Sequence, residues 1–162
     1  MRTFRRLSKR RNTGQRAFTL IEVLIVIAIV AILASLAAPS FSDLIKSQKV
    51  KSTASDLNAA LALARSEAVK RNRDVTMSPA TAGNWQDGWQ IADPDNAGIN
   101  IEVHAAIAGL TVTGPASVIY RSSGRVSGTT APAFDISAAG GTAHACVSAD
   151  LSGRPYIKAA AC

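Results

Sequence analysis

The sequence is poor in the residue types that carry most enzyme chemistry. It has only two histidines and two cysteines among 162 residues, and aromatic residues make up 5% of the chain. Cys146 and Cys162 lack zinc-ligand spacing, and His104 and His144 stand alone, so we expect no metal site. No nucleophile elbow, P-loop, dinucleotide fingerprint or paired-carboxylate motif is present. The sequence therefore predicts no catalytic residue, no cofactor and no enzyme.

Acidic residues are absent from positions 1–17, where seven basic residues lie: Arg2, Arg5, Arg6, Lys9, Arg10, Arg11 and Arg16. From Phe18 to Ala38 the chain is almost wholly apolar, and Glu22 is the one ionisable residue. As a helix this segment reaches roughly 31 Å, enough to cross the core of a bilayer. The basic excess before it predicts a cytoplasmic N-terminus, with the rest of the chain across the membrane.

Three interpretations of this segment are open. The small residues Ala31, Ala34 and Ala37 are compatible with a cleaved secretory signal peptide. A plain membrane anchor, in which Glu22 has no task, is the second. A carboxylate near the end of a membrane span is costly to bury and is by default a functional-site candidate, which favours a third interpretation with a role for Glu22.

The basic leader, the sequence Phe-Thr-Leu-Ile-Glu at 18–22 and the apolar helix resemble the prepilins of type IV pili and type II secretion systems. The resemblance implies that a prepilin peptidase cuts between Ala17 and Phe18 and that Phe18 becomes N-methylated. It also implies that Glu22 is the acidic fifth residue of the mature chain and that Pro39 kinks the helix. Ala17 departs from the glycine that the family usually has before the cut.

In a cleaved prepilin, the charge of Glu22 is expected to pair with a positive charge. Cleavage would leave a positive amine at a helix N-terminus, where the macrodipole already places partial positive charge. Because an unpaired charge in an apolar helix bundle is heavily penalised, pairing Glu22 with a neighbouring amine can set the stagger between subunits. We therefore predict that Glu22 serves assembly with other pilins or pseudopilins.

The net charge of +7 suggests a nucleic-acid partner, but the leader accounts for all of it. Without the leader, 11 basic residues balance 11 acidic ones. We expect a leader at 1–17, a transmembrane and assembly helix at 18–38, an amphipathic helix at 39–73 and a globular head at 74–162. The amphipathic helix has an apolar stripe at Val50, Ala54, Leu57, Leu61, Ala64 and Ala68, whereas Glu67 and Arg71 are expected on its solvated face.

Beyond Asn72 the pattern changes to short apolar runs separated by turn residues. The predicted strands are Asp74–Met77, Trp89–Ala92, Ile99–Val103, Leu110–Thr113, Ser117–Tyr120, Ala133–Ile136, Ala145–Ser148 and Pro155–Lys158. Eight strands with no helix between them favour an α+β fold, in which a long N-terminal helix packs against a small, mostly antiparallel head. The resemblance to prepilins implies that this fold is pilin-like.

Three internal stretches narrow the resemblance. They are Leu63–Arg73, Trp85–Trp89, which we expect to form a turn, and Ser152–Pro155. Together they resemble the group that joins pseudopilin H of type II secretion to the FimT and FimU minor pilins. Trp85 and Trp89 are expected to pack in the core or against a turn.

In the oxidising periplasm, a disulfide between Cys146 and Cys162 would close a loop of about fifteen residues and contribute roughly 3 kcal/mol.

FimT-like minor pilins that bind DNA carry a Gly-Arg-x-Arg motif in this loop. Gly153 and Arg154 match it, but Tyr156 replaces the second arginine. Lys158 is a further candidate contact, as are Arg121 and Arg125 from another loop, and Tyr156 offers a surface for base stacking. In the alternative interpretation, Arg154 only caps the last hairpin.

The leading prediction is a minor pilin or pseudopilin, a structural subunit that initiates or caps a type IV pilus or a type II secretion pseudopilus. The alternatives are a DNA-binding minor pilin for DNA uptake and an unrelated single-pass membrane protein. We expect the chain to span the bacterial inner membrane once, with its head in the periplasm, and to join the filament after assembly. The choice between pilus and secretion system stays open.

Overall fold

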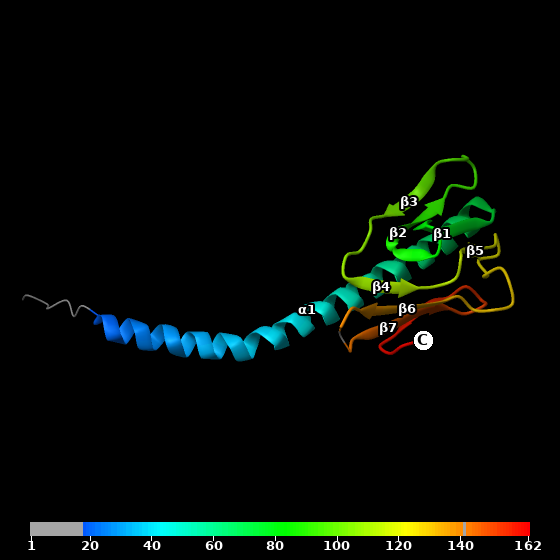
Figure 1. Ribbon diagram of the computed structural model, residues 1–162. Coiled ribbons are helices and arrows are strands. Elements are labelled where there is room, and N and C mark those ends of the chain that lie inside the picture. The colour runs from blue at the N-terminus through cyan, green and yellow to red at the C-terminus, as the bar shows by residue number, and fades with distance from the viewer. Residues whose placement is uncertain (1–17, 141) are drawn as a thin grey trace, which may run out of the picture. The chain divides into compact units, whose positions relative to one another are not determined.

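The computed structural model describes residues 18–140 and 142–162, without the side chains of residues 36–40. One long helix, α1 (Leu20–Arg71), precedes eight strands (Figure 1). The strands are β1 (Val75–Thr81), β2 (Asn84–Ala92), β3 (Asn100–His104), β4 (Leu110–Thr113), β5 (Val118–Tyr120), β6 (Ala133–Ala138), β7 (His144–Ala149) and β8 (Pro155–Lys158). The chain divides into two units, one ending at Pro39 and one comprising Ser40–Cys162, which are treated separately below. The expected leader at 1–17 lies outside the described residues.

In the first unit, the helix exposes its large apolar side chains on all sides. Their exposed fractions range from 47% at Val23 to 79% at Leu20. Within the part of the chain that the structure describes, no helix is long and apolar enough to cross a membrane. Pro39 lies within the helix, but its side chain is outside the description, so the kink stays a prediction.

In the second unit, α1 carries the predicted apolar stripe. All six stripe residues are buried, with exposed fractions of 0–1%. The helix ends at Arg71 because Asn72 adopts a left-handed conformation, with φ of 52°. The Asn72 N–H then donates to the Val69 carbonyl and the Arg73 N–H to the Ala68 carbonyl, which is the Schellman pattern of helix termination.

The prediction that Glu67 lies on a solvated face is wrong. Glu67 is buried, with an exposed fraction of 8%. It lies three residues after Ala64, at the margin of the stripe, and the Arg71 Nε donates to its carboxylate at 2.7 Å. Arg71 also reaches two carboxylates of the β2–β3 loop, Asp93 and Asp95, so this helix face packs against the head and the pair is not simply solvated.

The eight predicted strands all form, in two antiparallel four-stranded sheets. Their strand orders are β3-β2-β1-β5 and β4-β6-β7-β8, and every pairing is antiparallel. This confirms the predicted α+β fold of a long helix and a mostly antiparallel head. One local prediction was wrong, because Trp85–Trp89 lies within β2 and is not a turn. Gly88 permits this strand conformation, since a Cβ there would collide with the backbone carbonyl of His104.

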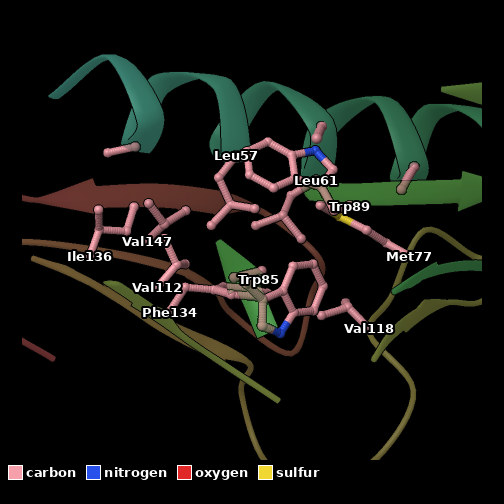
Figure 2. Packing of buried hydrophobic residues seen from close by; sticks show 14 of the residues in the cluster. Leu57, Leu61, Met77, Trp85, Trp89, Val112, Val118, Phe134, Ile136 and Val147 are labelled. Atoms are coloured by element: carbon pink, nitrogen blue, oxygen red, sulfur yellow. The ribbon is translucent and has the colours of Figure 1, made fainter. Parts of the chain in front are cut away.

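The core lies between α1 and the sheets and is built around the few large side chains of the sequence. Figure 2 shows Leu57 and Leu61 projecting from the helix toward Trp85, Trp89 and Phe134, and all five are fully buried. The Trp85 and Phe134 rings meet edge to face, with centroids 4.7 Å apart. Trp85 Nε1 donates to the Pro115 carbonyl at 2.8 Å, which satisfies its polar group within the core.

The expected disulfide joins Cys146 of β7 to Cys162, with Cα atoms 5.0 Å apart. The backbone N–H of Cys162 also donates to the Asp135 carboxylate of β6. The last four residues after β8 are therefore tied back to the neighbouring strands of their sheet.

Candidate functional site

The predicted assembly segment begins with a helix cap. Thr19 precedes the first helical residue, and its hydroxyl and carbonyl oxygens both accept from the Glu22 N–H, at 3.3 and 3.1 Å. Threonine followed three residues later by glutamate is the sequence of a capping box. Glu22 thus occupies the third helical position, where its negative charge opposes the helix macrodipole. The Glu22 side chain is exposed.

Helix α1 starts two residues after Phe18, the expected first residue of the mature chain. Ala17, on the other side of the predicted cut, lies outside the described residues. The structure therefore describes only the mature side of that junction.

The predicted DNA-binding loop forms a tight turn organised by Asp150. The Gly153 N–H donates to the Asp150 carbonyl at 2.8 Å, and the Arg154 N–H donates to the Asp150 carboxylate at 3.0 Å. Hydrogen bonds from the Ser152 hydroxyl and from the Arg154 N–H hold the pKa of Asp150 below its usual range. It is the backbone of Arg154 that helps to close this turn. The Arg154 side chain is 78% exposed, with Nε 4.0 Å from the Asp150 carboxylate.

A second turn, at residues 121–125, packs directly against the first. The Arg121 N–H donates to the Arg125 carbonyl, and the Gly124 N–H to the Arg121 carbonyl. Gly153 has a φ of 89°, and a Cβ on it would collide with the carbonyl oxygen of Gly124. The structure therefore brings the turn that carries Arg121 and Arg125 against the turn that carries Arg154.

Arg65 of α1 joins the two turns, and the sequence analysis missed it. Its Nε donates to the Gly124 carbonyl at 3.1 Å and its Nη2 to the Ser152 carbonyl at 3.4 Å. The sequence feature that could have identified Arg65 is its position directly after Ala64 of the buried stripe. A long charged side chain at that position needs hydrogen-bond partners from the head. Tyr120 lies just before the second turn, and burial raises the pKa of its phenol to about 12.

The remaining DNA candidates lie on β8. Lys158 Nζ lies 5.3 Å from the centroid of the Tyr156 ring, so the lysine packs over the aromatic face on which a base would stack. Arg121 and Arg125, on the turn that packs against the Arg154 turn, are the cations that could take the place of the second arginine, and DNA binding stays a prediction. Among residues 18–140 and 142–162, no three histidine, cysteine or acidic side chains gather into a group that could hold a metal ion.

Comparison with known proteins gives two family matches. Residues 53–153 match the family described as Type II transport protein GspH. Residues 12–38 match the Prokaryotic N-terminal methylation motif. The second match contains the predicted junction between Ala17 and Phe18.

Among solved structures, the fold is similar to that of the type IV minor pilin FimU of Pseudomonas aeruginosa strain PAO1. In one crystal form the identity is 24% and the TM-score 0.59, over 67% of this chain and 91% of FimU. It is also similar to the minor pseudopilin EpsH of the Type 2 Secretion System of Vibrio cholerae. There the identity is 17% and the TM-score 0.53, over 68% of this chain and 97% of EpsH.

The long helix and the two-sheet head therefore have a pilin-like α+β fold. Because the GspH match covers more than half of the chain, the protein belongs to the Type II transport protein GspH family. It is a minor pilin or pseudopilin, a class of subunit used by type IV pili and type II secretion systems.

Proposed function

We propose that this protein enters its filament through the first part of α1 and acts at filament initiation or at the tip. One observation carries the proposal: the head has a closed core of its own, whereas Ile25, Ile29 and Leu33 stay 52–60% exposed. Apolar side chains on all sides of a helix need a lipid or protein environment. The membrane before assembly, and the helices of other pilins after it, supply such an environment.

In this proposal a prepilin peptidase removes residues 1–17 in the inner membrane, and the head lies in the periplasm. The match to the methylation motif and the helix start at Leu20 support a cut between Ala17 and Phe18. Mass spectrometry of the membrane-extracted protein is expected to find an N-methylated Phe18 as the first residue. A mature chain that began at Ser35, Ala38 or Ser40 would instead indicate a conventional signal peptide and contradict the proposal.

Glu22 then has two separable tasks, to cap its own helix and to pair with the N-terminal amine of a neighbouring subunit. Glutamine keeps the side-chain oxygen of a capping box but removes the charge. We therefore expect Glu22→Gln and Glu22→Ala both to abolish incorporation into filaments. Thr19→Ala, which removes the hydroxyl cap and keeps the charge, is the matched control and is expected to assemble.

The measurement is the amount of this subunit in sheared filaments relative to its amount in the membrane. Membrane insertion should be intact in the Glu22 variants, because loss of the charge makes the segment more apolar. Normal incorporation of Glu22→Gln would show that capping is the whole task of Glu22 and would remove its role in assembly.

A further inference from the structure

Three large apolar side chains at the start of the second unit stay outside its core. Phe41, Leu44 and Ile45 are 64%, 63% and 46% exposed. Residues three and four apart on a helix lie side by side, so these three form one apolar patch. In the sequence the patch directly follows the apolar segment that ends at Ala38, whereas the buried stripe begins only at Val50. Exposed apolar surface therefore continues in the chain beyond the predicted membrane span.

Three lysines follow the patch within six residues: Lys46, Lys49 and Lys51. One carboxylate accompanies them, that of Asp43, which lies 3.7 Å from the Lys46 Nζ. Three lysines against one aspartate leave residues 41–51 with an excess of positive charge. Basic residues normally gather on the cytoplasmic side of a membrane, so lysines that follow the predicted span are unusual. Their presence favours an anionic partner that lies close to the membrane.

The loops beside these lysines carry no charge. Positions 105–109 and 139–143 contain only alanine, glycine, isoleucine and threonine, and the two loops lie at the same end of the head (Figure 1). The Lys46 Nζ donates to the Gly140 carbonyl and the Lys49 Nζ to the Ala108 carbonyl, both at 3.4 Å. A carbonyl oxygen takes one of the three donors of an ammonium group and leaves its charge without a counterion. This end of the head therefore presents lysine charge among small uncharged residues.

We propose that residues 41–51 of α1, here called the basal segment, bind the anionic phospholipid headgroups of the membrane that holds the first part of the helix. A headgroup layer is about 5–8 Å thick, which a helix crosses in about four or five residues. From a span that ends at Ala38, Phe41 and Leu44 lie in that layer, and the lysines reach the phosphates at its outer border.

The order of the residues selects a lipid surface as the partner. A bilayer offers apolar groups first and anionic groups next along its normal, which is the order in which the apolar patch and the lysines follow one another. The inference rests on the proposed function, because it requires the first part of α1 to lie in the membrane.

The first experiment measures how accessible single lysines are in the full chain in nanodiscs. One set of discs contains phosphatidylcholine alone, and the other contains an equal mixture of phosphatidylcholine and phosphatidylglycerol. Mass spectrometry follows the acetylation of each lysine. We expect the rates at Lys49 and Lys51 to fall about fivefold in the mixed discs, and the rates at Lys70 and Lys158 to stay unchanged. Equal rates at Lys49 and Lys51 in the two discs would overturn the proposal.

The second experiment compares two double variants of the full chain that lose the same charge. Lys49→Gln/Lys51→Gln changes the basal segment, and Arg125→Gln/Arg154→Gln changes exposed positions on the two turns of the head. Native mass spectrometry counts the phospholipids that stay bound to chains released from the mixed discs. We expect the wild-type chain and the arginine variant to retain phosphatidylglycerol over phosphatidylcholine, and the lysine variant to lose this preference.

Equal resistance of both heads to protease separates this effect from misfolding. A lysine variant that keeps the preference, or an arginine variant that loses it to the same extent, would contradict binding by the basal segment.

The inference and the proposed function fail in different ways. If Glu22→Gln abolishes incorporation into filaments while Lys49 and Lys51 react equally in the two discs, the lipid contact is wrong and the proposed function stands. If the full chain does not enter the discs at all, the membrane-embedded state in the proposed function is wrong, and the lipid contact is wrong with it.

Discussion

The two parts of α1 use the same residue types for opposite purposes. In the first unit, Leu24 and Ile25 are 56% and 54% exposed, whereas in the second unit Leu57 and Leu61 are fully buried. Burial of apolar surface contributes about 25 cal/mol per Å², so only the second set stabilises the chain's own fold. The first set leaves its apolar surface exposed, and in our proposal lipid or other subunits cover it.

The sequence already contains this difference in its periodicity. Residues 18–38 are apolar in every direction around a helix, while residues 50–68 are apolar along a single stripe. A stripe has one partner surface, and here the head of the same chain supplies it. Substitutions in the two parts are therefore expected to act on different measurements, stability in one and assembly in the other.

The largest loss of stability is expected for Phe134→Ala. Phe134 is fully buried against Trp85, and removal of such a ring leaves a cavity that costs about 3–5 kcal/mol. Denaturant unfolding of the detergent-solubilised chain, followed by tryptophan fluorescence, measures the loss. Ile29→Ala is the matched control, since its side chain is 52% exposed and its replacement should leave head unfolding unchanged. A similar loss in both variants would contradict the division between the two parts of α1.

The disulfide is expected to have the next largest effect. Replacement of Cys146 and Cys162 by serine removes a crosslink between residues 16 positions apart, for which loop entropy predicts about 3 kcal/mol. The unfolding midpoint of the double variant should equal that of the wild-type protein measured in a reducing agent. If reduction leaves the unfolding midpoint unchanged, the hydrogen bond from Cys162 to Asp135 of β6 is sufficient to hold the C-terminal residues in place without the disulfide.

The sequence predicts the features that depend on residues close together in the chain, and it predicts poorly those that depend on residues far apart. The helix stripe, the eight strands and the disulfide partners follow from periodicity, turn residues and a count of two cysteines. Arg65 was missed because its partners, the Gly124 and Ser152 carbonyls, lie far away in the chain. Glu67 was placed in solvent because its i,i+4 spacing to Arg71 is typical of surface pairs. Only the tertiary position of Asp93 and Asp95 shows that this pair is enclosed.

Acid is expected to destabilise the head through these enclosed carboxylates. Hydrogen bonds from Arg71 and Lys70 lower the pKa of Glu67. The pKa of Asp93 is lowered first by a hydrogen bond from the Asp95 N–H, and then by the Asn96 side chain and the charge of Arg71. Because each folded-state pKa lies below the unfolded values of about 4.3 and 3.9, the stabilisation is present above those values. It is lost as the pH falls through the folded-state values.

Denaturant unfolding between pH 7 and pH 2 tests this expectation. The wild-type midpoint should be flat near neutrality and fall below about pH 4. In Arg71→Gln the two carboxyls lose their shared cation, so stability should be lower at pH 7 and should change less on acidification. An equally steep acid loss in Arg71→Gln would show that other groups dominate.

The smallest effect on stability is expected at Arg154, the exposed tip of the same head. Its side chain is 78% exposed and its backbone closes the turn, so Arg154→Ala should change stability by no more than about 0.5 kcal/mol.

The same variant tests DNA binding in a soluble fragment that begins near residue 45 and lacks the basic leader. We expect that fragment to show no binding to duplex DNA even at low salt. Tyr156 stands where the second arginine of the motif belongs, and Asp150 lies beside the remaining one. Binding that weakens as salt rises, and that Arg154→Ala and Lys158→Ala each reduce, would overturn this expectation and establish phosphate contacts at the tip.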